Sequence, residues 1–187
     1  ELKVKKVSSV TDQEEAAEAA RSQAELTGRH HPGATIEISI DAWFPPSYIP
    51  DEGGRMDLYR RISEIETMED YRNLYDELLD RFGEPGANQL ALLDIAYIKA
   101  QVERLGALAV VPKQQDIRIE FGDGKYLNQA AMGLLLTLPA WQQRLTLHAG
   151  KEPYILVHQA GGTPLAQLQT LRELFYDLER TIDQDAA

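Results

Sequence analysis

Alternating apolar and polar residues mark one short segment near the beginning of the chain. Ile36, Ile38 and Ile40 alternate with Glu37 and Ser39, which predicts a strand with one buried face. The segment that follows, FPPSYIPDEGG, holds three prolines and cannot continue inside a sheet. We therefore expect an ordered connector there rather than a second strand.

Helical spacing of apolar residues begins after this connector. It predicts helices over 55–65, 67–82 and 87–105, and the apolar side of the first is expected to hold Met56, Tyr59, Ile62 and Ile65. Thr67 and Asp70 have the spacing of a capping box, so the second helix should begin there. Gly83 suits a left-handed C-cap before Pro85, and Gly106 ends the third helix.

Short strands and helices alternate in the second half of the chain. Strands are predicted in LAVVP (108–112), QDIRIEF (115–121) and a hairpin pair within 144–150 and 153–159, with helices begun by Asn128 and by Thr163 and Pro164. Residues 1–33 are instead rich in Ala and Glu, and they are interpreted as a linker with a helical insert. The sequence thus predicts an α+β domain over 34–187, a helical cluster packed with a small, mostly antiparallel sheet.

Composition narrows the classes of function. The net charge is −11, which disfavours direct contact with nucleic acid, because phosphate binding relies on Lys and Arg. No apolar run is long enough to span a membrane. The absence of cysteine excludes disulfides and thiolate chemistry and fits a reducing cytoplasm. The chain begins with Glu1, so we expect a fragment of a larger protein or a processed product.

Catalytic and metal-binding signatures are not found in the sequence. No nucleophile elbow or comparable motif occurs, so no catalytic residue, metal site or cofactor is predicted. His30 and His31 are adjacent, and zinc would need further converging ligands. Paired carboxylates are abundant, but thirty acidic residues produce many pairs by chance. We expect this chain not to be an enzyme.

One acidic pair has an unfavourable position. Glu77 and Asp80 are one turn apart near the end of a predicted helix, where the helix dipole disfavours negative charge. A solvated helix surface is the ordinary interpretation. Arg72 or Arg81 could offset the charge locally, and an arginine on a partner could do so more strongly.

Four motifs follow one another within segment 36–106: the proline-rich FPPSYIPD, RMDLYRRI, ELLDRFG and LLDIA, at 44–51, 55–62, 77–83 and 92–96. In this order and spacing they resemble the C-terminal domain of the bacterial transcription-repair coupling factor (Mfd). The resemblance weakens but stays in register through IRIEF and the last predicted helix. It does not cover residues 1–33.

This resemblance implies an autoinhibitory domain of a large ATP-dependent DNA translocase that couples transcription to nucleotide-excision repair in the cytoplasm. In that family the domain docks on the UvrB-like N-terminal module of the same polypeptide and masks the surface that recruits UvrA. Through the parent it is connected to RNA polymerase. The family's acidic docking positions fall on Glu77 and Asp80, with Arg81 a neighbour in the same patch or an intrahelical partner of Glu77.

Two other functions remain open at this point. A stand-alone enzyme with a carboxylate pair would need a concave pocket that brings distant acidic residues together. An accessory nucleic-acid contact would have to use the only locally basic segments, KVKK and YRRIS.

Overall fold

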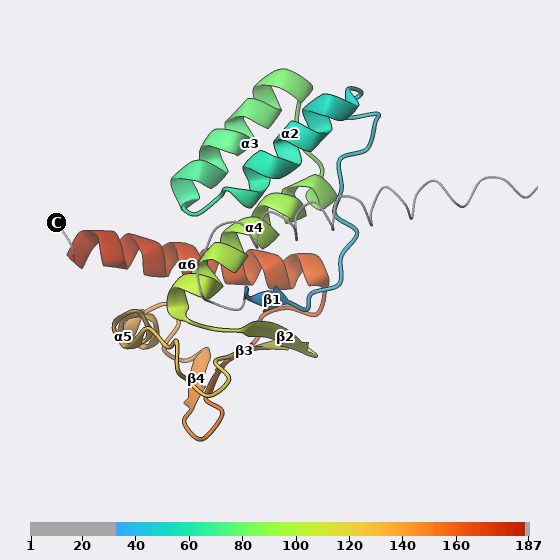
Figure 1. The fold of residues 1–187 in the computed structure, drawn as a ribbon. Helices are drawn as coiled ribbons and strands as arrows, with labels where there is room; N and C mark the ends of the chain where they lie inside the picture. Colours follow the sequence, from blue (N-terminus) through green and yellow to red (C-terminus); the bar gives the residue numbers. More distant parts are fainter. Residues whose placement is uncertain (1–32, 186–187) are drawn as a thin grey trace, which may run out of the picture. The chain divides into compact units, whose positions relative to one another are not determined.

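The structure, a computed structural model, describes residues 33–185 and confirms an α+β fold (Figure 1). The predicted linker over 1–33 lies outside the described residues, apart from Gly33. In chain order the elements are β1 (Thr35–Ile36), α2 (Glu52–Ser63), α3 (Met68–Phe82), α4 (Ala87–Leu105), β2 (Ala109–Lys113), β3 (Asp116–Glu120), α5 (Gln129–Thr137), β4 (Leu145–His148), β5 (Tyr154–Val157) and α6 (Pro164–Asp185).

The strands described in residues 33–185 form one mostly antiparallel sheet of five in the order β1-β2-β3-β5-β4. Within this described sheet only β1 and β2 are parallel. Ile119 of β3 lies opposite Val110 of β2 and Ile155 of β5, and all three side chains are fully buried. Alternate residues on these strands therefore face the core, as the period-two pattern requires. Helices α4 and α6 cross on one side of the sheet (Figure 1).

The strand predicted over 36–40 is largely wrong. Only Thr35 and Ile36 pair with β2, through hydrogen bonds from the Thr35 N–H to the Leu108 carbonyl and from the Glu37 N–H to the Val110 carbonyl, each 2.9 Å. Ile38 is nevertheless buried. The alternation correctly indicated one-sided burial, but burial does not require backbone pairing along the whole segment.

Helices α2 and α3 form a pair on the far side of α4 from the sheet (Figure 1). The apolar side of α3 is anchored by Tyr71, Leu74 and Leu78, all buried. On α2, Leu58 and Ile62 are buried, whereas Met56 is 47% exposed. The prediction that Met56 lies on the buried side of α2 is wrong. Leu58, one turn before Ile62, occupies the buried side, and Met56, two residues before Leu58, lies on the opposite side of the helix.

Buried polar contacts connect this helix pair to the rest of the domain. The Tyr71 hydroxyl donates to Asp94 of α4 (2.9 Å), and Arg172 of α6 donates to the same carboxylate oxygen (2.8 Å). Glu179 of α6 accepts from the Tyr97 hydroxyl (2.7 Å) and from the N–H of the first residue of α3 (3.1 Å). Burial raises the pKa of Asp94, and the Arg172 guanidinium opposes that rise.

The proline-rich connector is ordered, as expected, and it contacts both helices of the pair. Phe44 is buried and packs against Tyr59 of α2, whose hydroxyl accepts the Phe44 N–H (2.9 Å). Tyr48 packs on Phe82 and donates its hydroxyl to the Gly83 carbonyl (2.7 Å). The connector thereby holds the end of α3 close to α2.

Helix ends follow the local signals closely. The capping box of Thr67 and Asp70 is formed in full, and Asn128 caps α5. Gly106 ends α4, as predicted, and its backbone is left-handed at φ 81° and ψ 21°. The left-handed C-cap predicted at Gly83 is wrong, because its φ of 81° is combined with an extended ψ of −175°.

Candidate docking surface

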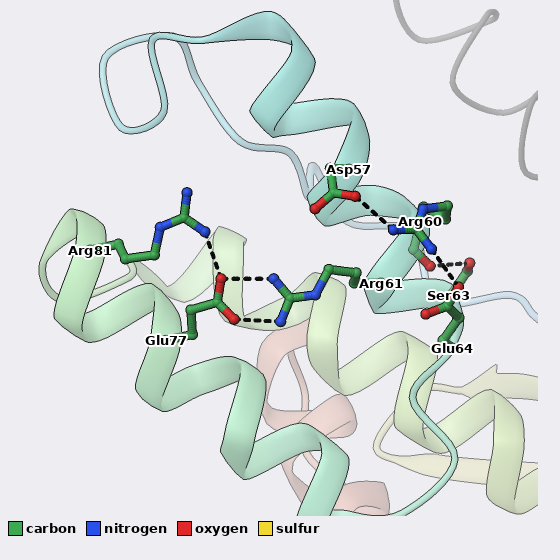
Figure 2. A network of polar contacts seen from close by, with 7 residues as sticks. All are labelled: Asp57, Arg60, Arg61, Ser63, Glu64, Glu77 and Arg81. Carbon is green, nitrogen blue, oxygen red and sulfur yellow. Dashed lines mark hydrogen bonds and ion pairs between the residues drawn. The ribbon is translucent and has the colours of Figure 1, made fainter.

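Glu77, Asp80 and Arg81 lie on the last two turns of α3, away from the buried side of that helix. The buried stripe through Leu74 and Leu78 directs Glu77 toward the flank that faces α2, while Asp80 and Arg81 are exposed. Figure 2 shows Glu77 between two arginines, one from each helix. The three residues named by the sequence are therefore neighbours at one edge of the helix pair.

Glu77 is paired within the domain. Arg61 of α2 donates from both guanidinium nitrogens, one to each carboxylate oxygen, with 2.7 Å between Nη1 and Oε1. Arg81 donates from Nη1 to the same Oε1 (2.6 Å) and is thus the intrahelical partner considered from the sequence. The fork-to-fork contact with Arg61 is the geometry in which arginine binds a carboxylate most strongly.

These contacts favour the ionised form of Glu77. Hydrogen bonds from Arg61, and then from Arg81, overcome the opposing effect of burial and lower the pKa of Glu77 to about 2. The carboxylate is therefore ionised at neutral pH. A carboxylate has about four acceptor positions, and the contacts from Arg61 and Arg81 use three of them. One position remains on Oε2, and 28% of the Glu77 side chain is exposed.

Asp80 differs from Glu77. It is exposed and forms no ion pair or hydrogen bond with any residue in 33–185. Arg81 keeps 53% of its side chain exposed and also lies over the Phe82 ring, 4.9 Å from its centroid. Within the described part of the chain, the surface therefore presents one carboxylate without a partner beside a carboxylate already held by two guanidinium groups. It is not a pair of equivalent free carboxylates.

Arg61 is not among the local partners predicted for Glu77 from the sequence, which are Arg72 and Arg81. Arg72 instead lies over the Tyr176 ring of α6 at 5.0 Å. A signal for Arg61 does exist: it precedes the buried Ile62, so it borders the apolar stripe of α2 and can reach a helix packed alongside. Identifying Glu77 as its partner requires knowledge of how the two helices pair.

An open depression of about 270 Å³ lies between α2 and α3 next to this surface. Its lining residues are Arg61, Glu64, Ile65, Asp70, Asn73 and Leu74. Glu64 pairs with Arg60 (3.0 Å), and Asp70 accepts the Thr67 N–H in the capping box (2.9 Å). Both carboxylates have structural partners, which gives no support to acid–base catalysis here.

A chain of polar side chains on the sheet has the residue types of a nucleophilic triad. Thr146 Oγ1 is 2.9 Å from His158 Nε2, and His158 Nδ1 is 3.2 Å from Asp116 Oδ2. The other oxygen of Asp116 accepts the Gln159 N–H (3.0 Å). We interpret these hydrogen-bonded side chains as a structural connection between the beginning of β3 and the end of β5. Among residues 33–185 no group of three or more His, Asp or Glu is arranged to hold a metal ion.

The site and fold define a small α+β domain with a mixed-charge surface on a helix pair. The sequence model of the TRCF domain family matches residues 38–132, just over half of the chain. The chain belongs to the TRCF domain family, the domain family of transcription-repair coupling factors.

Curated relatives agree with this assignment. The transcription-repair-coupling factor of Escherichia coli (strain K12) is 31% identical over 105 residues, which are 56% of this chain and 9% of that protein. The protein of the same name from Staphylococcus aureus (strain USA300) is 28% identical over 114 residues, 57% of this chain and 10% of its own length. The chain thus matches about a tenth of the length of each relative.

A known structure shows the same architecture. The crystal structure of a C-terminal domain of transcription-repair coupling factor superposes with a TM-score of 0.59 at 25% sequence identity. The superposition covers 82% of this chain and 98% of that domain. No helix in residues 33–185 combines the length and the apolar character needed to cross a bilayer.

Proposed function

We propose that this chain is the regulatory C-terminal domain of a transcription-repair coupling factor, without catalysis of its own. In this proposal it docks on the UvrB-like N-terminal module of the same polypeptide and masks the surface that recruits UvrA. The parent is a cytoplasmic, ATP-dependent DNA translocase that acts on RNA polymerase. Membership of the TRCF domain family supports the proposed parent protein. The charged surface on α2 and α3 supports the proposed docking.

The single observation that carries the docking role is the exposed Asp80, which has no partner among residues 33–185, beside the Arg61–Glu77–Arg81 cluster. Residues 51–84, which span the helix pair, hold eleven Asp and Glu against five Arg, a net charge of −6. Such a surface attracts a basic partner and repels phosphate. An exposed carboxylate with no partner in the described domain can accept a charged hydrogen bond from arginine, worth about 1.5–3 kcal/mol when well formed.

Reversible docking is consistent with this kind of contact. A few polar contacts hold two domains together more weakly than a large apolar interface does, so a competing ligand can shift the equilibrium. Because Glu77 already has partners, docking would add to its contacts at the remaining position on Oε2. Asp80 should therefore contribute more to the docking free energy than Glu77.

Comparison of UvrA binding by the full-length parent and its variants tests the proposal. We expect Asp80→Ala, and more so the Asp80→Ala and Glu77→Ala double variant, to bind UvrA several-fold more tightly than the natural sequence, because the masking domain is released. Glu69→Ala, at the opposite end of α3, removes the same charge and is the matched control. Unchanged UvrA affinity in the double variant would refute docking through this surface.

A further inference from the structure

We propose that Arg61 is a positioning residue for docking: it holds the Glu77 carboxylate in the orientation that the partner meets. The inference rests on the proposed docking function and adds a second helix to it. The residues that face the partner come from α3, while the residue that orients one of them comes from α2. Docking strength then depends on how the two helices are paired.

Geometry distinguishes Arg61 from the other arginine on Glu77. Arg61 uses two guanidinium nitrogens on two carboxylate oxygens, which fixes the plane of the carboxylate as well as its position. Arg81 uses one nitrogen on one oxygen. The Arg61 side chain is 33% exposed and that of Arg81 is 53% exposed. Arg81 can therefore turn toward a partner while Arg61 keeps Glu77 in place.

A held carboxylate binds more tightly than a mobile one. A free glutamate side chain samples many rotamers, and fixing them on association costs free energy. The fork from Arg61 has already restricted Glu77 before the partner arrives. Oε2, with its one remaining acceptor position, is then presented in a defined direction.

Arg60 supplies a matched control at the adjacent position of α2. Its guanidinium pairs with Asp57 (2.7 Å) and Glu64 (3.0 Å) on its own helix, and its side chain is 49% exposed. Figure 2 shows this second cluster apart from Glu77. Replacing Arg60 or Arg61 by Lys therefore preserves the charge and changes the helix composition equally, but it disturbs Glu77 only at Arg61.

The experiment measures binding of the 187-residue chain to the separately produced N-terminal module of the parent. Arg61→Lys keeps the positive charge and removes the two-pronged contact, so we expect binding about three- to tenfold weaker. Arg60→Lys should change it by less than about twofold. In the Glu77→Ala background, Arg61→Lys should cause no further loss. Thermal unfolding of each variant verifies that it is folded at the assay temperature.

The outcomes separate the positioning role from the docking function. Equal affinities for Arg61→Lys and Arg60→Lys would overturn the positioning role while leaving docking intact. Equal losses from Arg61→Lys with and without Glu77→Ala would also overturn it, because Arg61 would then act on the partner directly or through the fold. A natural chain that does not bind the module at all would refute the docking function, and this inference would fall with it.

Discussion

The paired state of Glu77 predicts a specific dependence of stability on pH. The contacts from Arg61 and Arg81 lower the pKa of Glu77 from its ordinary value of 4.5 to about 2. A group with a lowered pKa in the folded state stabilises that state above its unfolded pKa, and this contribution is lost as pH falls through the folded pKa. Stabilisation by Glu77 is therefore complete above about pH 5 and declines between about pH 4.5 and 2.

The magnitude follows from the shift and from the exposure of the site. A fully shielded group with this shift would contribute about 3 kcal/mol at neutral pH. The Glu77 side chain is 28% exposed, and solvent screening reduces the expected value to about 1–2 kcal/mol. Glu77→Gln should lower the free energy of unfolding by this amount at pH 7, and the difference from the natural chain should shrink below pH 4.5.

Urea unfolding monitored at pH 7, 5 and 3.5 measures this effect. Asp80→Asn is the control, because Asp80 has no partner in residues 33–185 and its neutralisation should change stability by less than about 0.5 kcal/mol. Equal effects of Glu77→Gln and Asp80→Asn at pH 7 would show that the pairing with Arg61 does not stabilise the domain. So would a difference that grows as the solution becomes more acidic.

Two further substitutions test the packing that supports the surface. Arg172→Met leaves the buried Asp94 with only the Tyr71 hydroxyl as a partner. It should lower the free energy of unfolding in urea by about 2–4 kcal/mol at pH 7, and by less at pH 4, where protonation relieves the buried charge. An equal loss at both pH values would contradict this account. Gly106→Ala places a Cβ 1.8 Å from the Tyr126 carbonyl oxygen, at a backbone φ of 81°. The free energy of unfolding should fall by about 1–3 kcal/mol. An unchanged melting temperature would contradict this expectation.

Helix boundaries were predictable because their signals are local. Thr67 and Asp70 specify the beginning of α3 through hydrogen bonds within four residues, and Gly106 ends α4 through its own backbone conformation. Neither signal depends on the rest of the fold. The α+β class was predictable because three consecutive helical segments precede strands that follow one another as antiparallel neighbours rather than as strand–helix–strand units.

Strand pairing was less predictable because it depends on residues far away in sequence. Thr35 pairs with Ala109, and which neighbour it would find cannot be read from the alternation around Ile36 and Ile38. The same limit applies to the surface. Glu77 was correctly placed on α3, but its principal partner Arg61 lies sixteen residues earlier on another helix. Sequence identified the carboxylate, and helix pairing decided whether it was free.

The short β1 strand has a mechanical consequence. Tension applied to the domain from the side of residue 33 would first load the two backbone hydrogen bonds of β1 and the contact from the Ala34 N–H to Glu103 (3.1 Å). Because β1 lies at the edge of the described sheet and pairs over two residues, few backbone hydrogen bonds oppose its separation from β2, although the buried Ala34 and Ile38 beside it would also leave the core. The β1–β2 pairing is therefore the first contact of the described domain that a force applied through residue 33 would break.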